Sequence, residues 1–276
     1  MKSAPFEYLR PKTLAEASAA LARDGVDTAA IAGGQSLMPM LSLRAAIVDL
    51  IVDISRLEEL KGAAETPAGL SLGALTSHAS VEDGKVPDLF NGLLRKIAGQ
   101  ISYRAVRNHG TIGGSVALAD PAADWPACLV ALGATARIAG RSGKRTQPVG
   151  EFVTGQYETT LQRGEIVLGF DLPRPDAPLR WGFAKVARKS GAFANSIAYA
   201  VRRGSDGPVT VVLSAAGPRP IVLPKAADAL RGQAAEDELR AAIAADIAAL
   251  APDADAYQTR MHTSTVLRAA RDMSRQ

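Results

Sequence analysis

The sequence predicts an α+β protein with an α/β region at the amino end and a smaller carboxyl-terminal domain made of an antiparallel sheet and helices. Strand, helix and strand patterns alternate over residues 6–54. Pro173, Pro175 and Pro178 lie close together, which indicates a domain boundary. Strand-like segments separated by glycine-rich turns follow, and then an alanine-rich helical pattern. We therefore expect one domain at residues 1–176 and a second at residues 177–276.

The amino-terminal elements lead to a pair of glycines. Thr13 and Glu16 have the spacing of a capping box that opens a helix. The apolar strand at residues 28–31 runs directly into Gly33 and Gly34. Ligands of α/β units bind near the carboxyl ends of strands, so this turn is a candidate binding site. Further elements are expected as strands at residues 6–9 and 47–54, with the first helix ending near Asp24-Gly25 and a short helix through Leu57 and Leu60.

The remaining elements follow from periodicity. Apolar residues recur at helical spacing in residues 88–98, and Asp124 lies in or just before the first turn of a helix at residues 126–132. Thr76 is expected to cap the short segment that holds His78. Strands are expected at residues 70–73, 135–139 and 165–172, and beyond the prolines at 181–187, 195–202 and 209–215, followed by helices at 234–250 and 263–273.

Composition excludes several classes of protein. The chain has 276 residues, 47% of them apolar and 22% charged, as in an ordinary globular protein. The net charge is +4, but lysine and arginine are scattered, so we expect no nucleic-acid partner. The single cysteine, Cys128, excludes an internal disulfide, gives no support to a protein-held iron–sulfur cluster and is interpreted as a buried apolar residue. No long apolar segment predicts a membrane span, and a cytoplasmic location is expected.

Two glycine pairs carry the candidate chemistry. The first lies in Ile31-Ala32-Gly33-Gly34-Gln35-Ser36-Leu37, and the second in Arg107-Asn108-His109-Gly110-Thr111-Ile112-Gly113-Gly114-Ser115. Glycines let main-chain N–H groups approach a phosphate, and the flanking hydroxyl groups add donors. A single such pair is more often a turn or a helix terminus, and neither motif has Rossmann or nucleoside-triphosphate loop spacing. Together they indicate a ligand with a diphosphate at its centre.

The residues alone do not assign a functional role to Asp124 or Lys185. A carboxylate at Asp124 can accept hydrogen bonds from sugar hydroxyls, or it can simply favour a helix amino terminus. Lys185 is by itself best interpreted as a solvated charge on a strand. For Asp124 both alternatives remain open at this point.

These motifs, together with Ala119-Asp120-Pro121-Ala122-Ala123-Asp124, resemble the FAD-binding medium subunit of molybdenum hydroxylases of the carbon monoxide dehydrogenase and xanthine dehydrogenase family. The resemblance extends from Phe6 to about Ala216. It implies an FAD-binding domain of two α/β subdomains, of the vanillyl-alcohol-oxidase or PCMH type, followed by the smaller carboxyl-terminal domain.

The resemblance also implies roles for individual residues. One loop would hold the FAD diphosphate from one side and the second loop from the other, with further contacts to the sugar, the ribityl chain and the flavin. The implied cofactor-binding residues are Ala32, Gly33, Gly34, Gln35, Ser36, Leu37, Ile101, Thr111, Gly113, Gly114, Ser115, Ala123, Asp124, Val167, Leu168 and Lys185, with no catalytic side chain and no metal ligand.

The chain departs from the family pattern at two places. Ala192 stands where the family often has an aspartate, and Leu118 stands where a polar residue is common. Neither position belongs to the glycine loops, so we expect FAD binding to be retained and the exposed face of the flavin to be affected.

The function implied by the resemblance is electron transfer. A large molybdopterin-binding subunit would oxidise the substrate, and a small subunit with two-iron, two-sulfur clusters would relay electrons to FAD in this chain. The FAD would pass them to an external acceptor, in a heterotrimer or a dimer of heterotrimers. The alternative is a stand-alone flavin-dependent oxidase of related fold, which would turn over alone and often holds flavin covalently.

Overall fold

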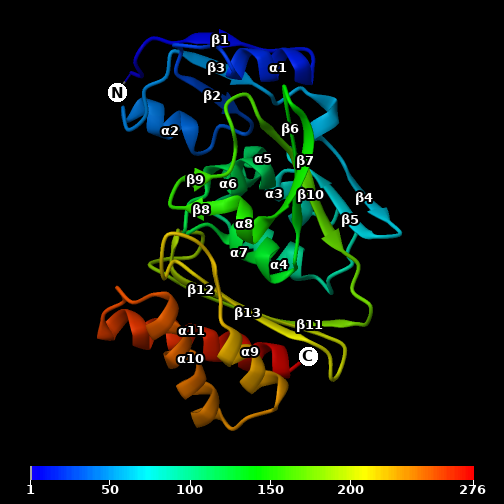
Figure 1. Cartoon of the computed structure of the whole chain (residues 1–276), viewed down its shortest axis with the longest axis vertical. Coiled ribbons are helices and arrows are strands. Elements are labelled where there is room, and N and C mark those ends of the chain that lie inside the picture. Colours follow the sequence, from blue (N-terminus) through cyan, green and yellow to red (C-terminus); the bar gives the residue numbers. More distant parts are fainter. Residues whose placement is uncertain (1) are drawn as a thin grey trace.

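The three larger β-sheets follow one another along the long axis of the molecule (Figure 1). The structure is a computed structural model that describes residues 2–276. Each sheet is associated with its own helices, so the chain forms two amino-terminal subdomains and a carboxyl-terminal sheet-and-helix unit. The predicted α+β class is confirmed. No helix within the described residues is both long enough and apolar enough to cross a membrane.

The first subdomain is a parallel three-stranded sheet in the order β1-β3-β2. Its strands are β1 (Glu7–Leu9), β2 (Thr28–Ile31) and β3 (Leu50–Asp53), and its helices are α1 (Leu14–Leu21) and α2 (Leu37–Ser42). The Thr13 side chain caps α1 by accepting the Glu16 N–H, as predicted. The predicted capping box is incomplete, because the Glu16 carboxylate accepts from the N–H of Lys12 instead of that of Thr13. β3 is also shorter than predicted.

Asp53, at the end of β3, holds β1 in place. Its carboxylate accepts hydrogen bonds from the Tyr8 hydroxyl, from Arg10 Nε at 2.8 Å and from the Ser55 N–H at 2.9 Å. Burial acts to raise the pKa of Asp53, but the hydrogen bonds from Ser55, Tyr8 and Arg10 outweigh it and lower the pKa to about 2.

We expect Asp53→Asn to lower the free energy of unfolding by about 2 kcal/mol at neutral pH, because hydrogen bonds to a charged acceptor are lost. The folded-state pKa lies below the ordinary value of 3.8, so this contribution is present above about pH 4 and is lost as the pH falls toward 2. In urea unfolding measured from pH 7 to 2, the free energies of unfolding of wild type and variant should therefore converge at the lowest pH. Asp24→Asn, an exposed change, should follow wild type throughout. Parallel profiles for wild type and Asp53→Asn would contradict this assignment.

The second subdomain is built on an antiparallel five-stranded sheet in the order β4-β5-β10-β6-β7. Its core contains Trp125, Phe170 and Cys128, all fully buried, which confirms the interpretation of Cys128. The strands are β4 (Ala63–Thr66), β5 (Gly69–Gly73), β6 (Thr135–Gly140), β7 (Gly143–Pro148) and β10 (Ile166–Pro173), with a separate hairpin of β8 (Val153–Gly155) and β9 (Glu158–Thr159). The helices are η1 (Glu58–Leu60), α3 (His78–Glu82), α4 (Leu93–Gly99), α5 (Arg104–His109), α6 (Ile112–Leu118), α7 (Asp124–Ala131) and α8 (Val149–Phe152).

Two local predictions in this subdomain are wrong. The helix predicted from residue 88 begins at Leu93, because Asn91 and Gly92 have φ of 51° and 77° and the Asp88 carboxylate binds the Gly92 N–H. The cap of α3 is Ser77, whose hydroxyl accepts the Ser80 N–H at 3.1 Å, and not Thr76. In both cases a local side-chain hydrogen bond decides the boundary.

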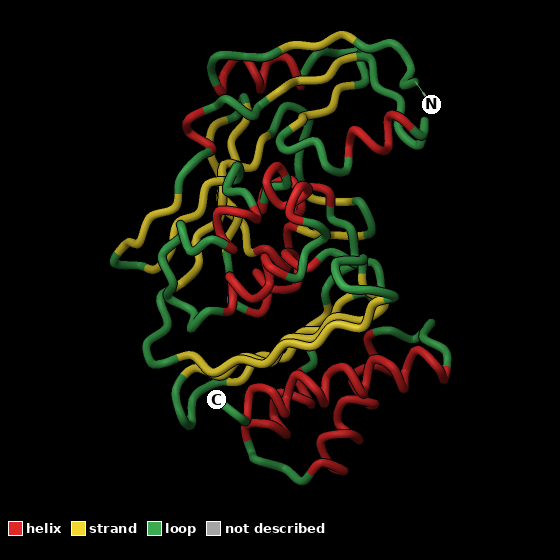
Figure 2. The backbone as a smooth tube through the Cα atoms, turned by 180° about the vertical axis from the view of Figure 1, so that it is seen from behind, coloured by secondary structure: helices red, strands yellow, loops and turns green. Residues whose placement is uncertain are grey.

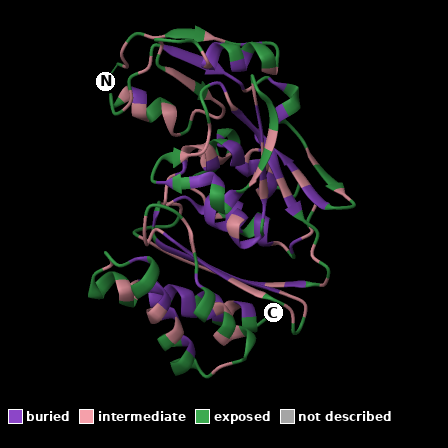
Figure 3. Cartoon of the chain, in the orientation of Figure 1, coloured by how far each residue is buried: buried purple, intermediate pink, exposed green. Residues whose placement is uncertain are grey.

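The carboxyl-terminal unit is an antiparallel sheet, β11-β12-β13-β14, with three helices on one face. Figure 2 shows this sheet between the middle helices and the carboxyl-terminal helices, and in Figure 3 its inner strand β12 is mostly buried. Tyr199 of β12 packs into the core of the second subdomain, while its neighbours Ala198 and Ala200 face the carboxyl-terminal helices. The elements are β11 (Leu179–Ala187), β12 (Ala194–Arg203), β13 (Val209–Ser214), β14 (Ile221–Val222), α9 (Pro224–Arg231), α10 (Glu236–Leu250) and α11 (Ala256–Ser274).

The last helix is longer than the predicted 263–273 because of its cap. Asp255 and Gln258 form a complete capping box that starts α11 seven residues earlier, at Ala256. The segment between Ala256 and His262 is mostly polar, so a search for apolar periodicity does not detect the start of this helix.

Candidate functional site

A cavity of about 840 Å³ lies where the two amino-terminal subdomains and β11 meet. Both glycine motifs open onto it. All the predicted site residues except Leu168 line it: Ala32, Gly33, Gly34, Gln35, Ser36, Leu37, Ile101, Thr111, Gly113, Gly114, Ser115, Ala123, Asp124, Val167 and Lys185. Leu168 instead packs in the apolar core of the first subdomain. Residues far apart in sequence are thus brought to one space, and their contact with a cofactor stays a prediction.

The first glycine motif forms the turn between β2 and α2. Gly34 has φ of +72°, a conformation that favours glycine. A Cβ on Gly33 would lie 1.9 Å from the carbonyl oxygen of His109, so glycine is required there by the close approach of the second motif. The Met38 N–H makes a helical hydrogen bond to the Gly34 carbonyl at 3.1 Å. The N–H groups that precede it have no helical partner, which makes this turn a source of free main-chain donors.

The second glycine motif differs from the predicted turn. Gly113 and Gly114 lie in the first turn of α6, and neither has a positive φ. The Gly113 N–H donates to the Ala74 carbonyl at 2.9 Å, and that of Gly114 donates to the Thr111 hydroxyl oxygen at 3.0 Å. A Cβ on Gly113 would lie 2.5 Å from the Ala74 side chain, so this glycine is required by packing.

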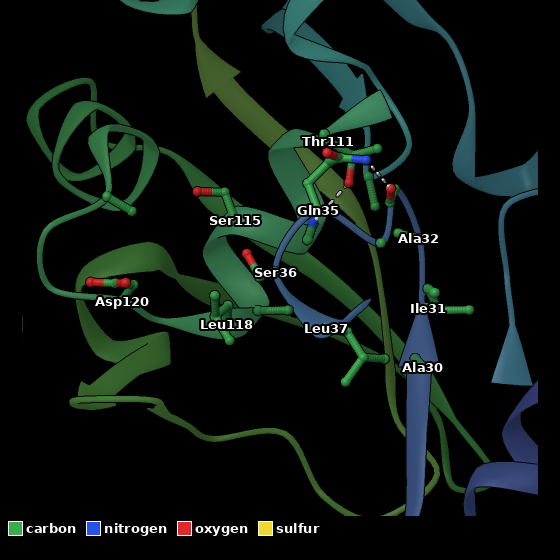
Figure 4. Close-up of a pocket in the computed structure, with 18 of the residues that line it drawn as sticks. Ala30, Ile31, Ala32, Gln35, Ser36, Leu37, Thr111, Ser115, Leu118 and Asp120 are labelled. Atoms are coloured by element: carbon green, nitrogen blue, oxygen red, sulfur yellow. Dashed lines mark hydrogen bonds between the residues drawn. The ribbon is translucent and has the colours of Figure 1, made fainter. Parts of the chain in front are cut away.

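The second motif therefore offers hydroxyl groups to the cavity instead of free N–H groups. Thr111 accepts with its oxygen, which leaves its hydroxyl hydrogen available to a ligand. Ser115 lines the same cavity. Figure 4 shows Ser36 and Leu37 of the first motif near Ser115 of the second motif and near Leu118, which follows it on α6. The two sides of the cavity are thus chemically different.

A buried ion pair lies on the cavity wall. Lys185 Nζ is 2.9 Å from Asp124 Oδ2, and the two side chains are only 9% and 6% exposed. Burial raises the pKa of Asp124, and the Lys185 ammonium opposes that rise. Asp124 Oδ1 is buried and has no hydrogen-bond partner among the described residues. An orphaned carboxylate oxygen beside a cavity is an acceptor for a ligand hydroxyl.

The rim of the cavity joins the second subdomain to the carboxyl-terminal unit. Ile101 and Gly191 form a parallel bridge, and the Ser102 N–H donates to the Gly191 carbonyl at 3.0 Å. Lys189 Nζ lies 3.0 Å from the Tyr103 hydroxyl at the mouth of the cavity. The departures at Ala192 and Leu118 also line the cavity.

Sequence reasoning missed two prominent cavity residues, His78 and Tyr103. Tyr103 is 62% exposed and has no distinguishing local pattern. His78 could have been noticed as a buried histidine on the inner side of a short helix, but its neighbour Trp125 is 47 residues away in sequence.

The residues present fit FAD. The cavity is within the range of about 300–1,000 Å³ typical of ligand sites. It offers free main-chain donors on one side, hydroxyl donors on the other and an orphaned carboxylate oxygen near an ammonium. These are the groups that a diphosphate and a polyol chain require.

Comparison with known proteins assigns the family. Residues 4–175 match the family described as the FAD binding domain in molybdopterin dehydrogenase. The carbon monoxide dehydrogenase medium chain of Hydrogenophaga pseudoflava is 34% identical over 274 residues, which is 96% of this chain and 95% of that one. The glyceraldehyde dehydrogenase medium chain of Sulfolobus acidocaldarius is 38% identical over 199 residues, 71% of this chain and 70% of its own.

A comparison of three-dimensional structures supports the same family. A solved carbon monoxide dehydrogenase from Hydrogenophaga pseudoflava, which lacks the Mo-pyranopterin moiety of its molybdenum cofactor, contains a chain with a TM-score of 0.92 and 33% identity, covering 100% of this chain and 99% of that one. The chain is therefore a flavoprotein subunit of an oxidoreductase. It belongs to the family of FAD-binding medium subunits of molybdenum hydroxylases.

Proposed function

We propose that this chain is the electron-transfer subunit of a molybdenum-containing hydroxylase or dehydrogenase, with FAD bound in the cavity between the two glycine motifs. The observation that carries the proposal is the buried, unpartnered Asp124 Oδ1 on the wall of a cavity that both motifs line. We also propose that residues 1–176 form the FAD-binding domain and residues 177–276 the second domain. A cytoplasmic location is part of the same proposal.

Different residues bind different parts of the cofactor. The free N–H groups of the turn at residues 33–37 bind the diphosphate, and the hydroxyl groups of Thr111 and Ser115 donate to it from the opposite side. Asp124 Oδ1 accepts from a ribityl or ribose hydroxyl, and Lys185 holds the Asp124 carboxylate in place. Ile101 and Val167 supply apolar walls that exclude water, next to Ala123.

FAD, when bound, supplies the ability to accept and release electrons singly or in pairs. In the proposed complex, a large molybdopterin-binding subunit oxidises the substrate and a small subunit with two-iron, two-sulfur clusters delivers the electrons to this chain. An external acceptor then receives them. The relatives named medium chains support an assembly with larger and smaller partners, and a heterotrimer or a dimer of heterotrimers is the proposed form.

The test uses the purified full chain. It should bind FAD at one site per chain, release all of it on acid precipitation, and show no oxidation of aldehydes, purines or carbon monoxide by itself. Chains purified from their native host should come with two partners, one of which contains molybdenum. Flavin retained in the acid precipitate, together with turnover by the isolated chain, would instead identify a stand-alone oxidase. Failure to bind FAD would contradict both the proposed electron-transfer subunit and the alternative of a stand-alone flavin oxidase.

A further inference from the structure

His78 is a buried histidine on the cavity wall with no role in the function described above. It is the first residue of α3, and its N–H donates to the Gly110 carbonyl at 2.9 Å. The residue is only 5% exposed, yet its side chain lines the cavity. The imidazole lies directly against Gly110, where a Cβ would come within 2.8 Å of Nε2. Gly110 therefore leaves room for this ring.

Trp125 determines which nitrogen of His78 carries the hydrogen. The indole Nε1–H, which can only donate, lies 3.0 Å from Nδ1 of His78. Nδ1 must therefore be the acceptor, and in the neutral ring the hydrogen is on Nε2. Burial lowers the pKa of His78 to about 4, and the charge of Arg107 acts in the same direction. The ring is thus neutral at physiological pH, with Nε2–H as a fixed donor.

This donor has no partner in the part of the chain that the structure describes. No hydrogen bond from Nε2 is found within residues 2–276, although the ring is held on its other side by Trp125. Among the described residues, the only fully enclosed side-chain polar atoms without a partner are Asp124 Oδ1 and Arg137 Nε, so Nε2 of His78 reaches open space. The open space that His78 lines is the cavity, where a ligand acceptor can bind this donor. The surroundings indicate which part of the ligand: Trp125, which holds the ring, directly follows Asp124, and Asp124 Oδ1 is the proposed acceptor for a ribityl hydroxyl.

We propose that the Nε2–H of His78 donates a hydrogen bond to an oxygen or nitrogen of the riboflavin half of the bound cofactor. The proposal rests on the proposed FAD site and adds a binding residue to it. Trp125 is the positioning residue, because its indole fixes the tautomer. The adenosine diphosphate half is contacted by other residues, namely the two glycine motifs.

The test compares ligands and variants. FAD, riboflavin and ADP are titrated into the cofactor-free full chain by calorimetry. His78→Phe should weaken FAD and riboflavin about tenfold, the loss of one hydrogen bond to a buried donor, and leave ADP unchanged. His78→Gln, which keeps a donor, should retain most of the affinity. His262→Gln changes a buried histidine that lies against Ser196 in another part of the fold and should bind all three ligands as wild type does.

A measurement on the wild-type chain does not depend on whether the variants fold. Long-range ¹H–¹⁵N spectra of the histidine rings should show the Nε2–H tautomer for His78 before and after riboflavin is added, with the Nε2 proton shifted by the ligand. In Trp125→Phe the tautomer should no longer be fixed.

Three results would overturn the proposal, and the first two are unchanged riboflavin affinity in His78→Phe and no shift of the Nε2 proton on riboflavin binding. An equal loss of ADP affinity would also overturn it, because the acceptor would then lie in the other half of the cofactor. A wild-type chain that binds none of the three ligands would contradict the FAD site itself, which is a different failure.

Discussion

Gly33→Ala should abolish tight FAD binding while most of the fold is retained. The new Cβ would lie 1.9 Å from the His109 carbonyl oxygen and 2.6 Å from its carbon, so the two glycine motifs must move apart. Backbone atoms cannot rotate away as a side chain can. Overpacking of this kind costs about 1–3 kcal/mol, which corresponds to a loss of about 5–150-fold in affinity if the strain is relieved only in the cofactor-free form. Fluorescence titration with FAD measures the effect.

The matched control is Gly217→Ala. A Cβ at Gly217 meets nothing within 4 Å, and the residue does not need a positive φ. This variant should bind FAD and unfold as wild type does. Wild-type FAD affinity in Gly33→Ala would show that the two motifs do not have to meet for binding, which contradicts the proposed site.

Lys185→Met should be the most destabilising single change at the cavity. It removes the ammonium 2.9 Å from Asp124 and leaves a buried carboxylate without a charge partner. Breaking a buried ion pair from one side costs about 3–5 kcal/mol. The double variant Lys185→Met with Asp124→Asn removes the uncompensated charge, so it should regain a large part of that loss in urea unfolding.

The pH dependence gives a second check on this pair. Burial already raises the pKa of Asp124, and loss of Lys185 raises it further. A folded-state pKa above the unfolded value of 3.8 means that the folded form binds the proton more tightly. Lys185→Met should therefore be more stable at pH 5 than at pH 8 relative to wild type, and the double variant should lack this difference. If the stability difference between Lys185→Met and wild type were the same at pH 5 and pH 8, the ion pair would have to be exposed to solvent, which contradicts its burial.

The first glycine motif was predictable because its signals are local. A strand pattern at residues 28–31 runs into a glycine pair, and the turn lies where the ligands of α/β units bind. The fold class followed from similar local patterns and from the proline cluster near residue 175. Glycine is required at position 33 because the His109 carbonyl lies close to it. No local sequence pattern connects these two residues.

The second motif could not be read correctly from the sequence. Gly113 looks like a residue that admits a phosphate, but Ala74 occupies the space beside it and accepts its N–H. Helix starts depend on capping side chains, and a hydrophobic pattern does not detect these, as Leu93 and Ala256 show. The pairing of Asp124 with Lys185, 61 residues apart, was not predicted, because the family resemblance implied only that each of them lies near the cofactor.

His78 and Trp125 illustrate the same limit. Each alone is an ordinary buried residue, and the fixed donor exists only because the fold places the indole against the imidazole. Tertiary contacts therefore decide which polar atoms remain free for a ligand.

The central claim is that the FAD diphosphate lies between the two glycine motifs, with main-chain donors on one side and hydroxyl donors on the other. A crystal structure of the full chain with FAD tests it directly. It should place diphosphate oxygens within about 3 Å of N–H groups at residues 33–37 and of the Thr111 or Ser115 hydroxyl. Diphosphate oxygens bound elsewhere in the cavity, or outside it, would contradict the claim.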